Sequence, residues 1–344
     1  MARADAMPSQ PPASALTLPW LATALLLAIL LSLLLGRYPI SIADALRVLG
    51  SKLGLPVRPV SQQVETVLLY VRLPRVTIAV LVGIALSVSG AAFQGIFRNA
   101  IVSPDLLGAS SGAGFGAAVS ILLSFGPVPM QLAAFACGTV AVLVAYGVSL
   151  FLGRSTVSLL LSGVAVAALF SAFTSMTKLV ADPTNKLPAI TFWLMGGLSN
   201  VTVRDVPVLF VTTLVGATPL FLLRWRLNIV ALGEDHALAL GMRLSRFQPL
   251  IVACATLLTA STVAICGMVG WVGLLVPNIA RLLVGSRFER LLPAAIFLGA
   301  TFVLLVDDVS RTLFAAEIPL GILFSLLGAP FLLFMLGRYK VGQL

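Results

Sequence analysis

Long apolar runs separated by short polar segments fill most of this 344-residue sequence. A helix needs about 20 apolar residues to cross a hydrocarbon core of about 30 Å. Ten runs approach that length, so the pattern predicts an all-α polytopic membrane protein with about ten transmembrane helices, although nine or eleven remain open. The expected spans are residues 16–35, 70–96, 106–124, 130–152, 157–180, 205–223, 248–269, 271–284, 291–310 and 319–336.

The eighth of these runs is the weakest. It is short and contains Pro277, and proline removes a backbone donor and kinks or breaks a helix. We therefore expect this helix to be broken or to cross only part of the membrane.

The N-terminal region divides into a tail and an apolar run. Residues 1–19 are rich in Pro, Ala and Ser, which suggests a disordered tail. The run Leu16–Leu35 is too long for a secretory signal, and no small-x-small cleavage site follows it before Arg37. We expect a disordered cytoplasmic tail over residues 1–19 and a single transmembrane domain over residues 20–340.

Small residues recur at helical spacing within the segment Arg72–Gly116. Every fourth position is small in two stripes, which are Gly83, Ser87, Ala91 and Gly95, and then Gly108, Gly112 and Gly116. Such stripes let helix backbones approach closely inside a bilayer. Glycine is also common in membrane spans generally, so the alternative is that either stripe only reflects composition.

Composition and charge agree with a membrane protein. Apolar residues make up 59% of the sequence and charged residues 10%, against about 25% charged in a soluble domain. With the N-terminus in the cytoplasm, the connections that face the cytoplasm are rich in arginine, as the positive-inside rule requires. These residues are Arg98, Arg154, Arg224, Arg226, Arg243, Arg246, Arg287 and Arg290, with Arg338 and Lys340 at the end of the chain.

The first outer loop breaks this trend. It holds six basic residues, which are Arg37, Arg47, Lys52, Arg58, Arg72 and Arg75. Such an excess invites a functional explanation. The net charge of +10 otherwise requires only the inside bias and anionic lipid, so we expect membrane lipid, and no nucleic acid, as a partner.

The sequence offers little for catalysis or metal binding. Cys137, Cys254 and Cys266 lie in apolar spans without metal-ligand spacing, and His236 is the single histidine. We therefore assign no catalytic residue, no metal and no cofactor to this chain. The sequence also lacks a G-x-x-x-x-G-K-[ST] phosphate loop, so an ATP-driven process would need ATP hydrolysis on a separate subunit.

The segment 228–246 has the pattern of a short soluble helix between two spans. Glu234 and Asp235 stand where the helix dipole favours anions, and Gly241 suits a left-handed stop. We expect a helix of one or two turns that couples the chain to a cytoplasmic motor domain. An ordinary polar loop is the alternative.

Four motifs occur in a characteristic order along the chain. They are the run Arg72–Gly116, LGEDHALALG at Leu232–Gly241, GMVGWVGLLVPNIARLLVG at Gly267–Gly285 and LVDDVSRTLFAAEIPLGILFSLLGAPFLLFML at Leu305–Leu336. Together they resemble the FecCD family, the membrane permease subunits of type II ABC importers for iron-siderophore complexes, haem and cobalamin.

The resemblance implies an assembly in the bacterial or archaeal cytoplasmic (inner) membrane. The chain would be a ten-helix, multi-pass permease with both termini in the cytoplasm, and a second copy of itself would complete a pore along the dimer axis. Two cytoplasmic ATPase subunits would bind below. A periplasmic or surface-anchored substrate-binding protein would dock above.

The resemblance also implies roles for individual residues at both ends of the pore. Arg72, Arg75 and Arg311 match family arginines that meet glutamates of the binding protein. Alternatively, Arg311 only neutralises Asp307 or Asp308, one turn earlier on the same helix. The expected ATPase contact consists of Gly233, Glu234, Asp235, Ala237 and Gly241.

The family's pore wall and gate match further positions. The expected pore wall is the small stripe of the fifth span, Gly163, Ala167, Ser171 and Ser175. The expected cytoplasmic gate comprises Asn99, Ser155 and Thr156. The sequence departs from many relatives at two positions, which are Ala100, where proline is common, and Asn278, where histidine is common.

These observations predict the permease of an ATP-driven importer for iron-siderophore, haem or cobalamin. The same class of importer carrying molybdate or tungstate is the alternative, because a pore wall without charge rings leaves selection to the binding protein. A secondary transporter is a remote alternative, and a non-transporting scaffold or receptor subunit is a third. Ion coupling normally needs ionisable residues at mid-membrane, whereas the candidates lie toward span ends: Glu65, Asp307, Asp308 and Glu317.

Overall fold

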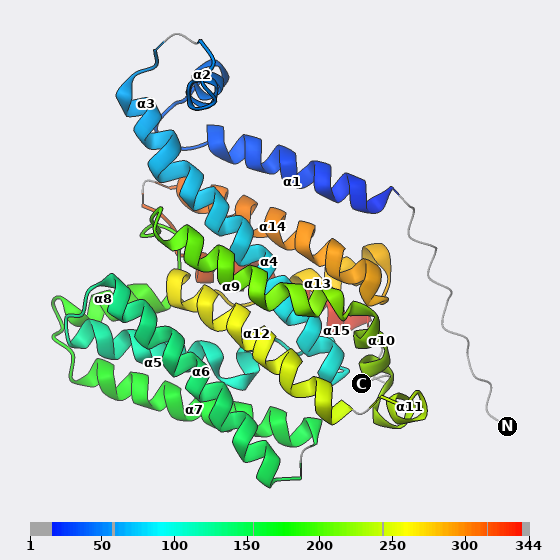
Figure 1. Ribbon diagram of the computed structural model, residues 1–344. Helices are drawn as coiled ribbons and strands as arrows, with labels where there is room; N and C mark the ends of the chain where they lie inside the picture. The colour runs from blue at the N-terminus through cyan, green and yellow to red at the C-terminus, as the bar shows by residue number, and fades with distance from the viewer. Residues whose placement is uncertain (1–15, 57–58, 154, 243, 315, 339–344) are drawn as a thin grey trace.

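The computed structural model describes residues 16–56, 59–153, 155–242, 244–314 and 316–338. These residues fold into helices joined by loops, with no strand among them. Seven helical segments of the described chain are long and apolar enough to cross a membrane, and three shorter apolar helices bring the number to ten. The predicted all-α architecture with about ten membrane helices is therefore confirmed (Figure 1).

The membrane helices follow the predicted apolar runs closely. The long ones are α1 (Thr17–Leu34), α4 (Leu73–Phe97), α6 (Pro127–Phe151), α7 (Thr156–Leu179), α9 (Asp205–Leu222), α12 (Leu244–Cys266) and α14 (Phe288–Thr312). The shorter ones are α5 (Ala109–Leu122), α13 (Val272–Val284) and α15 (Leu320–Arg338). α12 ends before residue 269, because Gly267 has a φ of +70° and starts a non-helical segment.

Short helices that the apolar runs did not predict cover the two ends of the bundle. One end carries α2 (Ile42–Lys52) and α3 (Gln62–Thr66), and the π-helical segment η1 (Val67–Arg72) joins α3 to α4. The opposite end carries α10 (Arg224–Leu232) and α11 (Glu234–Ala239) (Figure 1). We call these the α2 end and the α11 end. Two other short helices, η2 (Pro104–Leu107) and α8 (Lys186–Leu194), lie between membrane helices.

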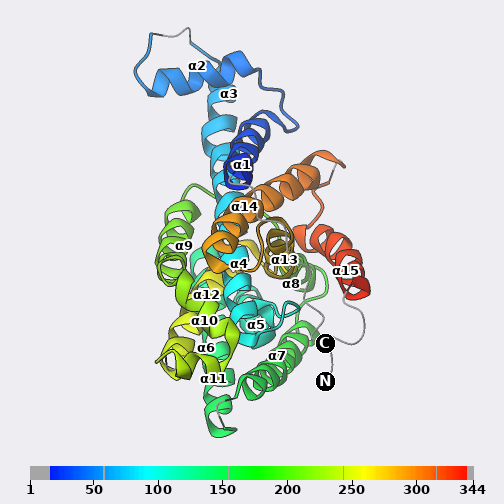
Figure 2. The same ribbon diagram turned by 90° about the vertical axis from the view of Figure 1, so that its right-hand side faces the viewer.

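α4 forms the centre of the bundle, and α9, α12, α13 and α14 pack against it. A Cβ on Gly83 would lie 2.2 Å from the carbonyl oxygen of Gly299 in α14. A Cβ on Gly116 of α5 would lie 2.4 Å from the carbonyl oxygen of Ala133 in α6. The backbones can approach this closely only because these positions carry no side chain, so the small stripes do pack helices together. In Figure 2, α7 and α15 lie on one side of α4 and α9 on the other.

Candidate functional site

α11 is the short helix that the segment 228–246 predicted. It covers Glu234–Ala239, and Gly241 follows it with a φ of +75°. The amide of Gly241 donates to the carbonyl oxygen of Leu238 at 2.9 Å. This is the left-handed glycine stop expected at a helix end, so the short helix is confirmed and the plain loop is excluded.

The residues expected to contact an ATPase have different environments. Gly233 and Ala237 are buried, whereas Gly241 is exposed. Glu234 and Asp235 begin α11, and their side chains lie outside the described part of the structure. Ala237 therefore anchors α11 to the bundle, and the family-based contact roles of these five residues stay predictions.

α11 exposes other side chains that the motif comparison missed. His236 is exposed, Leu238 is 52% exposed and Leu240, at the C-cap, is 62% exposed. Apolar side chains that are exposed together outside the spanning helices are typical of a surface that a partner covers. The available signal in the sequence was the pair of leucines, Leu238 and Leu240, in a short helix with an acidic start.

Arg98 connects the loop after α4 to the start of α11. Arg98 ends α4 with a left-handed backbone, with a φ of 49°, which is uncommon for residues other than glycine. Its guanidinium lies so close to Gly233 that a Cβ on that glycine would be 2.7 Å from Nη1. Gly233 itself has a φ of +106° and caps α11. The loop after α4 and the predicted coupling helix therefore touch through this pair.

A side chain of α13 also holds the loop after α4. The Asn278 side chain donates from Nδ2 to the carbonyl oxygen of Ala100 at 2.8 Å. Asn99 is exposed, and its Oδ1 accepts from the amide of Ile101 at 2.9 Å. Ala100 and Asn278, the two positions that the family resemblance singled out, are thus joined by a hydrogen bond.

The other two expected gate residues begin α7. The Oγ of Ser155 accepts a hydrogen bond from the amide of Ser158 at 3.0 Å, so Ser155 is the N-cap of the helix. A cap of this kind contributes about 1 kcal/mol. Thr156 is the first residue of the helix. A gating role for Asn99, Ser155 and Thr156 stays a prediction.

The small stripe of α7 runs through two different environments. Gly163 is buried against η2, because a Cβ there would lie 2.3 Å from the carbonyl oxygen of Leu106. Ala167 is half-buried, whereas Ser171 and Ser175 are exposed. Gly163 therefore packs against η2 within its own chain. A place in the pore wall for Gly163, Ala167, Ser171 and Ser175 stays a prediction. The uncovered small face of α7 includes three residues that the four-residue spacing missed: Ala165, Ala168 and Ala172.

The end of α8, the end of α12 and the start of α15 meet at one junction. The amide of Gly197, after α8, donates to the carbonyl oxygen of Cys266 at the end of α12, at 2.7 Å. The amide of Leu320 at the start of α15 donates to the carbonyl oxygen of Gly196 at 2.9 Å. Non-helical backbone within a membrane protein is tolerated where such partners satisfy it or where it lines a cavity.

A cavity of about 340 Å³ adjoins this junction. Backbone and side chains of the segment 196–200 line it, together with Gln131, Glu317 and Pro319. This cavity is not evident from the sequence, because its polar residues are scattered over nearly 190 positions along the chain and become neighbours only through the fold.

Arg75 ties α4 to α14 near the α2 end. Its Nε and Nη2 donate to the Asp307 carboxylate at 3.0 and 2.8 Å, and its Nη1 donates to Glu317 at 3.0 Å. Arg75 is 8% exposed and Asp307 is fully buried. Each charge therefore depends on the other for its stability in the interior.

Arg72 and Arg311 donate hydrogen bonds to the carbonyl oxygens at the C-terminal end of α1. Nη1 of Arg72 donates to the carbonyl oxygen of Leu34 at 2.7 Å, and Nη1 of Arg311 donates to that of Leu35 at 2.9 Å. The last carbonyls of a helix lack partners within the helix, so these cations satisfy them. Arg311 also pairs with Asp308, as the alternative interpretation of this arginine stated.

Intrachain partners account for the basic excess of the first outer loop. Arg58 lies outside the described residues, and each of the other five basic residues has an acceptor within the chain. Besides Arg72 and Arg75, these pairs are Arg47 with Asp44 at 3.2 Å, Lys52 with Glu65 at 2.6 Å, and Arg37 with the carbonyl oxygen of Phe314 at 3.3 Å. The hydrogen bond to Glu65 raises the pKa of Lys52. A docking role for Arg72, Arg75 and Arg311 therefore rests on the family resemblance and stays a prediction.

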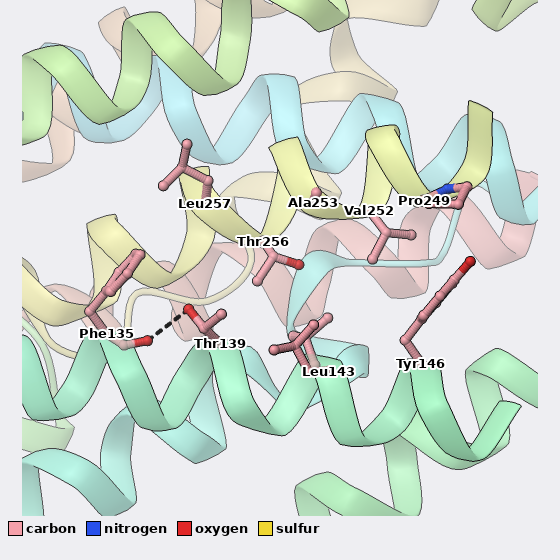
Figure 3. A pocket seen from close by; sticks show the side chains of 10 residues that line it. Phe135, Thr139, Leu143, Tyr146, Pro249, Val252, Ala253, Thr256 and Leu257 are labelled. Carbon is pink, nitrogen blue, oxygen red and sulfur yellow. Dashed lines mark hydrogen bonds between the residues drawn. The ribbon is translucent and has the colours of Figure 1, made fainter. Parts of the chain in front are cut away.

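A separate groove lies between α6 and α12, and side chains of both helices point into it (Figure 3). None of its ten lining residues is charged, and its lining is apolar apart from Thr139, Tyr146 and Thr256. The Thr139 hydroxyl donates to the carbonyl oxygen of Phe135 at 2.9 Å, which satisfies it within its own helix. This groove therefore suits a hydrocarbon chain.

The described residues offer no metal site. No group of three or more His, Cys, Asp or Glu side chains among them is arranged to hold a metal ion. Cys254 and Cys266 are buried and Cys137 is half-buried, and all three are free thiols.

Comparison with known proteins gives matches along almost the whole chain. The model of the FecCD transport family matches residues 24–338. The molybdate import permease MolB of Haemophilus influenzae is 38% identical over 321 residues, which cover 92% of this chain and 94% of that protein. The cobalamin import permease BtuC of Halobacterium salinarum is 38% identical over 276 residues, which cover 80% of this chain and 74% of that protein.

A solved structure has the same fold. It is a metal-chelate type ABC transporter in an inward-facing conformation, with a TM-score of 0.83 and 36% sequence identity. The similarity covers 93% of this chain and 98% of that chain.

Proposed function

This chain belongs to the FecCD transport family of ABC permeases, and from that membership we propose that it imports a metal chelate within an ATP-driven complex. Permease subunits of this family are not themselves enzymes. ATP hydrolysis would take place on two separate cytoplasmic subunits, and a binding protein on the other side of the membrane would deliver the cargo.

The observation that carries the proposal is the family match over residues 24–338. The matched region includes α11, the expected contact with the ATPase. His236, Leu238 and Leu240 would be covered by a groove on the ATPase. The contact of Arg98 with Gly233 supports this assignment, because movement of α11 would pass directly to the loop after α4. The α11 end would then face the cytoplasm, and both termini would lie there.

The pore would lie between two copies of the chain. The exposed small face of α7 supports this arrangement, since Ser171 and Ser175 offer weakly polar, uncharged surface. Such a wall holds cargo only weakly and lets it leave again, as conduction requires.

The binding protein would dock at the α2 end. Arg72, Arg75 and Arg311 are buried, so an approaching protein would first meet the groups that surround them. The side chain of Glu317, which pairs with Arg75, is 30% exposed and is the part of this network nearest to solvent. Docking would therefore act on α4 and α14 through Glu317 and Arg75.

A metal chelate is the favoured cargo, because a metal-chelate type transporter and a cobalamin permease match this chain over most of its length. Molybdate is the second candidate. It is favoured by the similarity to MolB, which extends over 92% of this chain. The class of importer is the same in both cases, and the binding protein would select between them.

Uptake into proteoliposomes tests the proposal. The chain is reconstituted with its ATPase and binding protein, and labelled ferric siderophore, haem, cobalamin and molybdate are offered with and without ATP inside. ATP-dependent uptake of one chelate supports the proposal, and ATP-dependent uptake of molybdate alone favours the second candidate. Uptake that requires no ATP and stops when an ionophore collapses the ion gradients would contradict the importer class.

A further inference from the structure

α2 carries an apolar face that no part of the described chain covers. A first apolar face, with Ala45 and Val48, packs on Val64 and Leu68 in the segment that leads into α4. Further around the helix lies a second, exposed stripe at the spacing i, i+4, i+7 and i+11. It consists of Ile42 (65% exposed), Leu46 (63%), Leu49 (41%) and, at the C-cap, Leu53 (79%).

The polar side chains of α2 lie opposite this stripe. Asp44, Arg47 and Ser51 recur at the spacing i, i+3 and i+7 and so share one face. The helix also has a defined start, because the Oγ of Ser41 accepts from the amide of Asp44 at 3.0 Å. α2 is therefore a well-capped amphipathic helix whose apolar side is larger than its packing within the chain requires.

α2 crosses the direction of the spanning helices. Figures 1 and 2 both show it beyond the end of α1 and running across the direction of α4. Leu33 and Leu34, at the end of α1, pack against the cluster that contains Ala45 and Val48. A helix that crosses spanning helices at the point where one of them ends runs along the membrane plane.

Exposed aromatic and apolar residues surround this position. Tyr38, in the segment between α1 and α2, is 38% exposed. Tyr70 and Val71 are 63% and 55% exposed, and they lie within one turn of Leu68, on which α2 packs. Tyrosine is enriched where acyl chains meet headgroups, so this part of the surface has the character of a membrane interface.

We propose that α2 is an interfacial helix that lies on the membrane surface, with Ile42, Leu46 and Leu49 inserted between lipid headgroups and acyl chains. Asp44, Arg47 and Ser51 then face water. The helix would thus hold the outer end of α1 and the segment before α4 at a fixed depth in the bilayer.

The chemistry of α2 favours lipid over a protein partner. The exposed stripe is purely aliphatic, and the cations next to it already have carboxylate partners, Arg47 with Asp44 and Lys52 with Glu65. A partner that is steered by charge would find these groups paired. A membrane surface requires only apolar area on one face and polar groups on the other, and α2 has both.

Spin labels on the two faces of α2 test this proposal. Cys137, Cys254 and Cys266 are replaced by alanine, and a nitroxide is then attached to Leu46→Cys or to the matched control Ser51→Cys. Both positions are exposed, so a label fits without repacking the helix. In proteoliposomes we expect the collision rate with O₂, relative to that with a water-soluble nickel chelate, to be several-fold higher at Leu46 than at Ser51.

Two results would overturn the proposal. One is an equally water-like ratio at Leu46 and Ser51, with a Leu49→Cys label giving the same answer from the same stripe. The other is a label at Leu46 that stays water-accessible until a binding protein is added, which would assign the stripe to a protein partner. Neither result affects the importer assignment, because the measurement needs no transport.

Discussion

Asn278 of α13 donates a hydrogen bond of 2.8 Å to the carbonyl oxygen of Ala100, in the loop that follows α4. These residues are 178 positions apart in the chain, so the fold alone brings them together. Asn278 therefore contributes a donor that holds the loop between Arg98 and η2 to α13. This loop also contains Asn99, an expected gate residue, so its attachment bears on how the cytoplasmic end of the pore would move.

Replacing Asn278 with alanine should loosen this loop. The Ala100 carbonyl oxygen would lose its partner, at a cost of about 1 to 3 kcal/mol if it stays buried. Asn278→His supplies a ring donor and is the matched control. Thermal unfolding in detergent should show a lower midpoint for Asn278→Ala than for Asn278→His, and equal midpoints for the wild type and the alanine variant would contradict a structural role.

Breaking the Arg75–Asp307 pair should destabilise the protein strongly. Arg75→Met removes the hydrogen-bonded partner of the buried Asp307 carboxylate and leaves it only the more distant Arg311, at 3.8 Å. Removing one partner of a buried pair costs about 3 to 5 kcal/mol. The double variant Arg75→Met/Asp307→Leu removes both charges and should regain much of the loss. Lys52→Met is the control, because its pair with Glu65 is exposed to solvent, and exposed ion pairs contribute little to stability. Similar unfolding midpoints for Arg75→Met and Lys52→Met would show that the buried pair contributes little.

Arg72, Arg75 and Arg311 are buried, so reversing their charge is a poor test of docking. Arg75→Glu would place three carboxylates together and harm folding before any partner binds. Glu317→Gln is a milder probe, because the Glu317 side chain is 30% exposed and Arg75 keeps Asp307. If docking acts through this network, Glu317→Gln should weaken binding-protein affinity at low salt more than at high salt. Wild-type affinity at both salt concentrations would argue against the proposed docking path.

Gly241 should be sensitive to the backbone preference of its replacement and insensitive to its size. Its φ is +75°, and no atom lies within 4 Å of a Cβ built on it. Valine disfavours this conformation by about 1 kcal/mol or more, whereas asparagine tolerates it. Gly241→Val should therefore weaken copurification of the ATPase while Gly241→Asn retains it. Equal copurification by both variants would show that ATPase contact does not depend on the left-handed stop of α11.

The sequence predicted the membrane helices well, because a bilayer demands long apolar runs whatever their neighbours are. It predicted less at the ends of the bundle. The eleven residues of α2 lie in the first outer loop, for which the sequence pattern predicted no helix. The partner of Arg75, Asp307, lies 232 positions away in the chain. The four-residue spacing also grouped Gly163 with Ser171. In the structure Gly163 packs against η2, whereas Ser171 is exposed.

The exposed face of α7 provides the sharpest test of the proposed pore. Ser171→Leu adds bulk to a side chain that is exposed in the single chain, so stability should change by no more than about 0.5 kcal/mol. ATP-dependent uptake should nevertheless fall several-fold, because the added volume would enter the path or separate the two copies. Gly163→Leu should instead lower the unfolding midpoint, since its Cβ would meet the carbonyl oxygen of Leu106 at 2.3 Å.

Val211→Phe is the control for added bulk on an exposed apolar surface, because Val211 is 55% exposed. It belongs to α9, and Figure 2 shows α9 on the other side of α4 from α7. This variant should leave both uptake and stability near the wild-type values. If Ser171→Leu transports as well as Val211→Phe does, the exposed face of α7 contacts lipid, and the path must follow another face. A loss of uptake in Ser171→Leu with an unchanged unfolding midpoint would instead locate Ser171 on the route of the cargo or on the contact between the two copies. Crosslinking of Ser171→Cys between copies, in the cysteine-free background, then separates these two positions.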